Sequence, residues 1–504
     1  MLAMVRSATL VGIEGRPVMV EVHVSSGIPG YHVVGLPDAA VRESRERVRA
    51  ALLSSEMEWP MKRVTVNLAP GGLRKSGPGL ELAVALGIAQ ARDQVAAGAL
   101  DGVGVIGELG LDGSVRGVPG TLALVDTLAQ EGCATVIVPY ANAVEAALVP
   151  GLAVRPARSL AELRAALKGE APWPACPDPP GPAAPGAGDD DDPLDLADVR
   201  GLPSARRAVE AAAAGGHHLL LTGPPGVGKT MLARRLPSIL APIEQAEALE
   251  ITRVHSAAGR QLPGGAGVLA DRRPFRSPHH SASVAALIGG GSGRVVPGEV
   301  TLAHRGVLFL DELGEFRPTT LDALRQPLED RAVHIARQGM SVTLPAVFQL
   351  VACSNPCPCG NGGTACTCTD AARARYRRRL SAPLLDRFDL RVTVRPPEVN
   401  DPAGEPSAAV RERVTAAVER QRFRHSDFPW RQNALLPASL LLQLVPLSGD
   451  ARDAWRWVTQ ERGLTARGAA RVRRVARTLA DLDDALDITE EHVVSAAYLR
   501  DEAR

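Results

Sequence analysis

Lysine and aromatic residues are scarce in this chain. Of its 57 lysines and arginines only four are lysines (Lys62, Lys75, Lys168 and Lys229), and aromatic residues make up 3% of its 504 residues. The arginine bias fits a GC-rich coding sequence, so Lys229 is notable for where it stands. Few aromatic side chains argue against platforms that stack nucleic-acid bases. The formal net charge of +1 gives no overall field, so any binding of polyanions would depend on local basic patches.

Long apolar runs and a secretion signal are also missing. Residues 1–7 have no basic segment followed by a sustained apolar stretch, and no apolar run approaches membrane-spanning length without charges. Seven cysteines, an odd number with four clustered, do not fit a secreted disulfide framework. We therefore expect a cytoplasmic protein with no membrane partner. The length predicts two or three domains.

A glycine-rich loop stands between a predicted strand and a predicted helix. Residues 218–221 are typical of a buried strand, and a helical pattern begins at Met231. Glycines in such a loop let backbone N–H groups surround phosphates, while Lys229 can reach the β- and γ-phosphates and the Thr230 hydroxyl can bind Mg²⁺. We predict a phosphate-binding loop for ATP. It consists of Gly223, Pro224, Pro225, Gly226, Val227, Gly228, Lys229 and Thr230.

A second apolar run, residues 307–310, ends in two carboxylates. A continuous apolar run predicts a strand buried on both faces, which would deliver Asp311 to the edge where open α/β sheets bind ligands. Asp311 is then expected to hold Mg²⁺ with Thr230, and Glu312 to polarise the attacking water. A lone glycine loop can be an ordinary turn, but the loop followed by this acidic pair indicates an NTPase.

Three more polar residues are candidates for the reaction. Asn355 follows a third predicted strand, 347–353, and could bond the γ-phosphate or its water, although asparagine before proline is also common in turns. Arg387 lies between two acids, which suits either a surface ion pair or an arginine that enters a neighbouring subunit's site. Arg467, near the start of a predicted helix, is a second candidate phosphate contact.

Four cysteines form a C-x-C-x6-C-x-C pattern in a glycine-rich loop. Four thiolates close together can form a tetrahedral zinc site, although this spacing is less specific than C-x2-C. The alternative is a loop with four reduced thiols. The candidate ligands are Cys357, Cys359, Cys366 and Cys368.

Composition divides the chain into four parts. The proline-, glycine- and aspartate-rich segment 169–194 predicts a flexible linker, although its acidic run could also dock on a basic surface. Residues 1–168 mix strand and helix patterns, including strands at 18–24 and 64–68 and a helix at 39–53. Residues 195–395 alternate strands and helices around the nucleotide motifs. Residues 396–504 are helix-rich near their end, with helices expected at 437–445, 451–461, 465–484 and 489–500.

These motifs resemble the AAA+ superfamily, its magnesium-chelatase-like branch, and within that branch the bacterial ComM/YifB family. The resemblance covers nearly the whole chain. It implies a P-loop AAA+ three-layer α/β core with a C-terminal helical lid, with Arg387 as the arginine finger and Arg467 as the second sensor. Family-like blocks occur at residues 35–45, 66–70, 273–280, 298–306, 323–330 and 355–360.

The N-terminal part resembles the proteolytic domain of Lon-type proteases, through residues 74–79 and 107–119. The resemblance places Gly79 where those enzymes have a serine and Leu122 near their lysine. A Ser–Lys pair needs both groups, so we expect a catalytically dead α+β domain and not a protease. Ser76 and Ser114 remain as stray hydroxyls. An assembly or DNA-contacting platform is the role we expect.

The resemblance further implies a hexameric DNA motor that drives branch migration during natural transformation. Two insertions are expected, a loop at 276–290 and a hairpin at 331–343. Arg331, His334 and Arg337 would line the pore of the ring and contact branched or single-stranded DNA. The dense arginines at 373–379 suit either DNA or a subunit interface.

Two other functions compete with a DNA motor. One is an ATPase that remodels a protein complex, in the manner of the magnesium chelatase motor subunit, which by resemblance lacks a Lon-like domain. The other is an ATP-switched scaffold that binds DNA. The presence of Glu312 and Arg387 argues against the scaffold, because a pure switch does not require fast hydrolysis.

Overall fold

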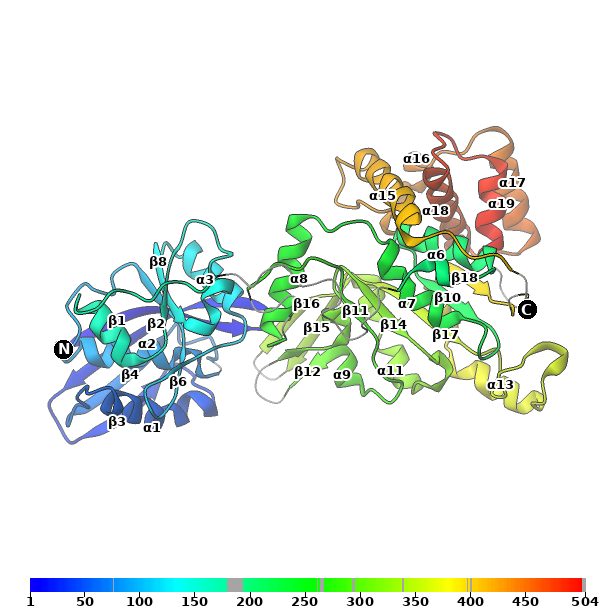
Figure 1. Ribbon diagram of the computed structural model, residues 1–504. Coiled ribbons are helices and arrows are strands. Elements are labelled where there is room, and N and C mark those ends of the chain that lie inside the picture. Colours follow the sequence, from blue (N-terminus) through cyan, green and yellow to red (C-terminus); the bar gives the residue numbers. More distant parts are fainter. Residues whose placement is uncertain are drawn as a thin grey trace.

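The computed structural model describes residues 1–178 except 76, and then 194–260, 262, 267–291, 295–337, 340–396, 398 and 401–500. Three regions follow one another along the molecule: an N-terminal sheet with helices, a central sheet, and a group of helices above the central sheet (Figure 1). Most of the predicted linker, residues 179–193, lies outside the described part. None of the described helices is both long and apolar enough to cross a membrane.

The N-terminal region is built on a seven-stranded mixed sheet in the order β3-β4-β2-β1-β5-β8-β9. Strands were expected at 18–24 and 64–68, and both are present within β2 and β4. The strands are β1 Leu2–Val11, β2 Glu14–Ser25, β3 Gly30–Val34, β4 Arg63–Ala69, β5 Val103–Val105, β8 Thr135–Pro139 and β9 Ala153–Ala157, with a small ribbon of β6 Glu108–Leu109 and β7 Val115–Arg116. The helices are α1 Ala39–Ser54, α2 Glu81–Gln90, α3 Thr121–Gln130, α4 Ala143–Ala146 and α5 Leu160–Leu167.

The central sheet has five parallel strands in the order β11-β14-β17-β10-β18. Alternate residues of β14 face opposite layers, since Val307 and Phe309 pack with the helices of one face and Leu308 and Leu310 with those of the other. Burial on both faces explains the uninterrupted apolar runs of these strands. The strands are β10 Leu219–Thr222, β11 Phe275–Arg276, β14 Val307–Leu310, β17 Gln349–Ser354 and β18 Leu390–Thr393.

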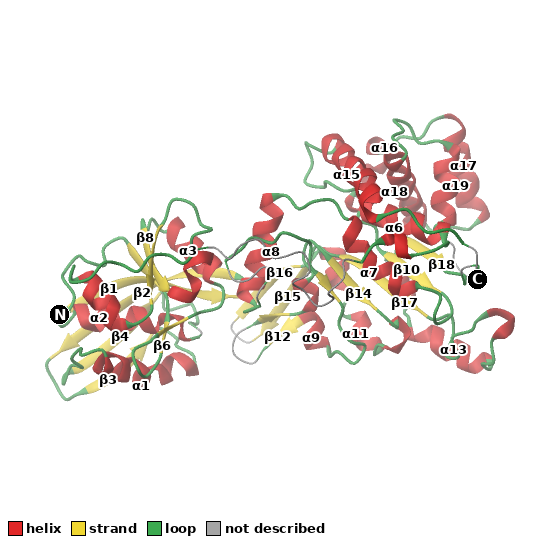
Figure 2. Ribbon diagram, viewed as in Figure 1, coloured by secondary structure: helices red, strands yellow, loops and turns green. Residues whose placement is uncertain are grey.

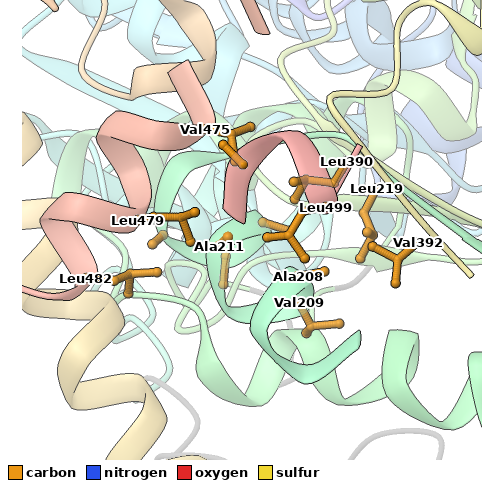
Figure 3. Packing of buried hydrophobic residues seen from close by; sticks show 14 of the residues in the cluster. Ala208, Val209, Ala211, Leu219, Leu390, Val392, Val475, Leu479, Leu482 and Leu499 are labelled. Atoms are coloured by element: carbon orange, nitrogen blue, oxygen red, sulfur yellow. The ribbon is translucent and has the colours of Figure 1, made fainter. Parts of the chain in front are cut away.

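Helices cover both faces of this sheet, which gives the expected three-layer arrangement. Figure 3 shows Ala208 and Ala211 of α6 packed beside Leu219 and Leu390 of the sheet. The main helices are α6 Pro203–Gly215, α7 Lys229–Ile239 and α8 Gln245–Ala257. The shorter elements are α9 Val284–Ile288, α10 Glu299–Leu302, α11 Pro318–Asp322, α12 Arg325–Asp330, α13 Asp370–Arg379, α14 Ala382–Leu385, the ribbon β12 Gly289–Gly290 with β13 Val296–Pro297, and the hairpin β15 Ala332–Arg337 with β16 Met340–Pro345.

The C-terminal region is helical throughout its described elements (Figure 2). Its helices are α15 Ser407–Arg424, α16 Leu441–Leu444, α17 Gly449–Glu461, α18 Ala466–Leu482 and α19 Glu490–Tyr498. Three of the four expected helices are present, as α17, α18 and α19. The fourth, 437–445, is wrong: a 3₁₀ turn at Ala438–Leu440 precedes the single turn of α16. Only Leu441 and Val445 of this segment are fully buried, so it lacks the continuous apolar stripe that would stabilise a longer helix.

The N-terminal region packs directly on the central one. Leu10 and Ile13 belong to the same apolar cluster as Val342 and Leu344 of the β15–β16 hairpin. Gly12, at the β1–β2 turn, has a φ of +65°, and a Cβ there would lie 2.4 Å from Val342. Polar contacts also cross between α3 and α8, since Arg253 bonds Asp126 at 2.9 Å. The hairpin is therefore covered on one side by the N-terminal region.

A buried carboxylate links three parts of the helical region. Asp481 of α18 is 0% exposed and accepts bonds from Arg424, Arg477 and Asn433. Replacing Asp481 by Ala would leave Arg477 buried without its charged partner. We expect the free energy of unfolding of this region to fall by about 3–5 kcal/mol.

Urea unfolding followed by tryptophan fluorescence would measure this change, because Trp430, Trp455 and Trp457 lie in the helical region. Asp453→Ala is a matched control, because the Asp453 side chain is 76% exposed. The control should change stability by about 0.5 kcal/mol or less. Equal effects of the two substitutions would contradict the assigned importance of the buried ion cluster.

Candidate functional site

The glycine-rich loop connects the carboxyl end of β10 to the first turn of α7. Gly226 and Gly228 have φ of +78° and +92°, which side chains rarely allow. A Cβ on Gly223 would lie 2.4 Å from the carbonyl oxygen of Val394, so only glycine fits there. The loop therefore delivers Lys229 and Thr230 as the first residues of α7, at the positive end of the helix dipole.

Lys229 joins the loop to the next strand. Its Nζ donates to the carbonyl oxygens of Gly223 and Pro224, both at 2.7 Å, and to Oδ1 of Asn355 at 3.2 Å. Burial lowers the pKa of the Lys229 ammonium. Asn355 follows β17, which pairs with β10, so the two predicted phosphate contacts lie side by side. The structure brings Lys229 and Asn355 into one site.

Asp311 and Thr230 face each other across the same edge of the sheet. The Thr230 hydroxyl donates to Oδ2 of Asp311 at 3.0 Å, and Oδ1 of Asp311 accepts from the Glu312 N–H at 2.9 Å. A carboxylate beside a hydroxyl offers the hard oxygen ligands that Mg²⁺ prefers. These two residues fit the magnesium role that the sequence predicts.

Glu312 extends into open space from an unusual backbone conformation. Its φ is +51°, and its side chain is 57% exposed. Oε2 of Glu312 lies 3.3 Å from Nδ1 of His280, whose ring packs at a tilt of 35° against that of His279 with centroids 4.0 Å apart. The contact joins residues 32 positions apart, so no spacing in the sequence could have revealed it.

A cavity of about 810 Å³ lies between the start of α6 and the helical region. Leu202 reaches both this cavity and the phosphate loop, since its Cδ1 lies 3.7 Å from where a Cβ on Gly228 would stand. Leu479, Asp483, His492 and Ser495 line the opposite side. The cavity is suited to the base and ribose of a nucleotide whose phosphates occupy the loop. No sequence motif marks these residues, so they could not be predicted.

Arg387 lies far from this site. It stands three residues before β18, at the amino end of a strand that runs parallel to β10. The phosphate loop lies at the opposite, carboxyl end of these strands. Since β18 has four residues with a rise of about 3.3 Å each, Arg387 is separated from the loop by about 13 Å or more along the sheet. Its Nη1 donates to the Pro383 carbonyl oxygen at 2.9 Å and its Nη2 to Glu329 at 2.5 Å. Arg387 is therefore not placed to touch the nucleotide of its own chain.

Arg467 is on the same side of the molecule as Arg387. It is exposed in the first turn of α18, and one turn later Arg471 bonds Asp389 at 3.0 Å, just before β18. Within the described part of the chain, no polar partner is recorded for its side chain. Because Arg471 lies at the amino end of β18, this end of α18 is at the edge of the sheet away from Lys229.

Arg331 and His334, two of the three residues expected at a pore, do not share one surface. Arg331 turns away from the hairpin, has a φ of +57°, and donates to the Leu435 carbonyl oxygen at 3.2 Å. It lines a cavity of about 170 Å³ together with Arg387 and four other arginines. His334 is exposed on the hairpin and bonds the Thr343 hydroxyl at 3.1 Å. The side chain of Arg337 lies outside the described part of the chain.

The arginine-rich helix α13 presents several unpaired charges to solvent. Arg375, Arg377 and Arg378 are exposed, and no partner is recorded for them among the described residues. Arg379 instead bonds the Gly314 carbonyl oxygen at 2.9 Å and Glu315 at 3.1 Å. The basic surface is therefore attached to the loop that follows Glu312.

The four clustered cysteines meet at one point. Their sulfur atoms all lie within 4.8 Å of one another. Backbone N–H groups of Asn361 and Thr367 point at Cys359 and lower the pKa of its thiol to about 5, whereas the pKa of the neighbouring Cys368 thiol is raised to about 12. Soft thiolates arranged in this way are typical zinc ligands.

The N-terminal region contains no Ser–Lys pair at the two positions compared with Lon-type proteases. Gly79 lies in a short 3₁₀ turn, and Leu122 is a buried residue of α3. The Ser114 hydroxyl is exposed and donates to Asp112 at 2.6 Å, and Ser76 lies outside the described residues. Lys75 is fully buried, and its Nζ donates to the Pro70 carbonyl oxygen.

Known families and relatives match this chain over almost its whole length. The family described as magnesium chelatase, subunit ChlI, matches residues 195–401; subunit ChlI of Mg-chelatase matches 20–142; and the C-terminal part of that subunit matches 404–500. An uncharacterized protein of Mycobacterium tuberculosis is 44% identical over 94% of both chains. The uncharacterized protein YifB of Escherichia coli is 41% identical over 99% of this chain and 97% of YifB. The competence protein ComM of Haemophilus influenzae is 39% identical over 99% of this chain and 97% of ComM.

Proposed function

Because the chain belongs to the magnesium-chelatase-like ComM/YifB family of AAA+ ATPases, we propose that it is a ring-forming motor that hydrolyses ATP between subunits and moves DNA. In this proposal Lys229 and Asn355 bind the phosphates, Thr230 and Asp311 hold Mg²⁺, and Glu312 polarises the attacking water. Mg²⁺ would supply charge neutralisation at the β- and γ-phosphates. The protein's own groups position the phosphates and the water.

The position of Arg387 carries the proposal of a ring. Phosphoryl transfer gains much of its rate from an arginine that neutralises the transition state. Arg387 is at the edge of the sheet opposite the phosphate loop, so it fits such a role only at the nucleotide of a neighbouring copy. Arg467 lies at this same edge. We propose that six copies form a closed ring in which the same head-to-tail contact repeats. Each bound nucleotide would then receive one arginine from the neighbouring subunit.

DNA is the proposed substrate, and branch migration during recombination the proposed reaction. The name of the Haemophilus influenzae relative concerns competence, which involves DNA. Exposed arginines of α13, and His334 of the hairpin, suit contacts with the phosphate backbone. We place the units at 1–168, 169–194, 195–395 and 396–504, with the N-terminal unit as a non-proteolytic, Lon-like platform.

The runner-up is remodelling of a protein complex, as in the magnesium chelatase motor subunit. The family description for residues 20–142 also names a chelatase subunit. The presence of the N-terminal unit therefore does not separate the two functions, and only the substrate can.

ATP-dependent movement of a mobile four-way DNA junction tests the DNA proposal directly. We expect the purified protein to dissociate the junction with ATP and Mg²⁺, and Glu312→Gln to abolish the reaction. Rising salt should weaken DNA binding steeply, because each phosphate contact releases a counterion. An assembled protein whose ATPase ignores DNA and that moves no junction would favour the remodelling function instead.

A further inference from the structure

We propose that Cys357, Cys359, Cys366 and Cys368 bind one Zn²⁺, and that this ion fixes the loop that shapes the ATP site from the β17 side. The coupling to ATP rests on the proposed ATPase function, whereas the metal site does not. The four thiols lie close to the predicted ATP site, because their loop begins at Asn355 and contacts the phosphate loop.

The sulfur positions fit a tetrahedral ion. With Zn–S bonds of about 2.3 Å, sulfur atoms at the corners of a tetrahedron lie about 3.8 Å apart. The observed separations are 3.3 Å for Cys357–Cys359, 3.5 Å for Cys357–Cys366 and 3.8 Å for Cys359–Cys366. The Cys359 N–H also donates to the Cys368 sulfur at 3.3 Å, and such a bond stabilises a thiolate. Disulfide sulfurs would be about 2.05 Å apart, so none of these three pairs has that geometry.

Two contacts connect the thiolate loop to the phosphates. Oδ1 of Asn355, two residues before the first cysteine, accepts from Lys229 at 3.2 Å. Gly360, between the cysteine pairs, has a φ of +85°, and a Cβ there would lie 2.8 Å from Cδ of Pro225 in the phosphate loop. An ion that holds Cys357 and Cys359 therefore also fixes the residues on both sides of them, against Lys229 and against Pro225.

The loop continues into a third contact, with the segment that carries Glu312. Tyr376 of α13 is buried, and its hydroxyl lies 2.3 Å from where a Cβ on Gly314 would stand. Arg379 donates to the Gly314 carbonyl oxygen at 2.9 Å. Residues 355–379 thus contact the phosphate loop, Lys229 and the segment after Glu312. A metal ion in this loop would therefore restrict the positions of the phosphate loop, of Lys229 and of the segment after Glu312.

Metal content and nucleotide binding, measured on the same full-length protein, test the proposal. We expect an untagged preparation to contain one Zn²⁺ per chain, released when the thiols are blocked with a mercurial. The double variant Cys366→Ser/Cys368→Ser should lose the metal and bind a non-hydrolysable ATP analogue about tenfold more weakly. Cys176→Ser, at an exposed cysteine, is the matched control and should change neither quantity.

Gly360→Ala separates the metal from its coupling to the phosphates. It should keep one Zn²⁺ per chain yet weaken binding of the ATP analogue, because the new methyl group meets Pro225 and alanine disfavours the φ of +85° at this position. Metal-free wild-type protein with four freely reactive thiols, or with disulfides, would overturn the zinc site. If the wild-type protein holds zinc but neither Gly360→Ala nor loss of zinc in the double variant changes the affinity for the analogue, the coupling is overturned. Wild-type protein that binds zinc but no ATP analogue would instead refute the proposed function.

Discussion

Glu312→Gln is expected to bind ATP with near-normal affinity and to hydrolyse it about 10²–10⁴-fold more slowly. The carboxylate of Glu312 follows Asp311 directly, at the edge of the sheet where Lys229 and Asn355 meet. Glutamine has the same shape and can still bond His280, but it cannot take a proton from water. Binding of a fluorescent ATP analogue and release of inorganic phosphate would measure the two parts of the prediction.

Glu315→Gln is the matched control for this experiment. Glu315 is an exposed carboxylate three residues further along, and it pairs with Arg379 at 3.1 Å instead of reaching the nucleotide edge. It should retain most of the turnover. A Glu312→Gln protein that hydrolyses ATP at near the wild-type rate would remove Glu312 from the water-activating role.

Local motifs were enough to predict which residues meet at this edge of the sheet, because each motif is a contiguous stretch of sequence. The glycines of the loop from Gly223 to Thr230 and the apolar run of β14 that ends at Asp311 can both be recognised directly in the sequence. The expectation of a parallel sheet then suffices to bring Asp311 and Asn355 to one edge, since both follow strands that run in the same direction. Hence the predicted phosphate and magnesium residues lie together.

Features that depend on the packing of distant segments could not be predicted in this way. Arg331 belongs to a hairpin in the sequence, but its side chain lines the cavity that also contains Arg387. The His280–Glu312 contact depends on how a loop returns to the sheet. The helix α15 was missed, although its buried residues Val410, Val414 and Val418 follow a helical spacing. The expected helix at 437–445 was wrong because only two residues of that leucine-rich segment are buried.

The distance of Arg387 from the phosphate loop of its own chain makes the subunit interface testable. Arg387→Ala is expected to lower the rate of hydrolysis by about 10³-fold or more while ATP binding persists. Lys229→Ala should be inactive because its own phosphate site is lost. Each variant keeps what the other lacks: the first has intact phosphate loops, and the second has intact arginines.

Mixing the two variants should therefore restore hydrolysis only where an intact loop meets an intact arginine. In a closed ring with one site per interface, random mixing at equal amounts gives about a quarter of interfaces with both groups. Activity should peak at equal amounts and fall to zero at either extreme, as phosphate release across a series of ratios would show. An arginine that acted on its own chain's nucleotide would give no activity at any ratio.

The control uses the double variant Arg387→Ala/Lys229→Ala in place of Lys229→Ala, because no interface with Arg387→Ala then contains the arginine. Glu312→Gln is a second partner that still binds ATP, so a failure of Lys229→Ala to join the ring would not hide the effect. Assembly of each mixture would be checked by native mass spectrometry.

Since Glu329 binds Arg387 at 2.5 Å within the same chain, hydrolysis in trans also requires this ion pair to open when a neighbouring γ-phosphate competes for the guanidinium. Glu329→Gln weakens that ion pair. Added to the Lys229→Ala subunits, which keep Arg387, it should leave the activity maximum at equal amounts of the two variants and should not lower the maximal rate.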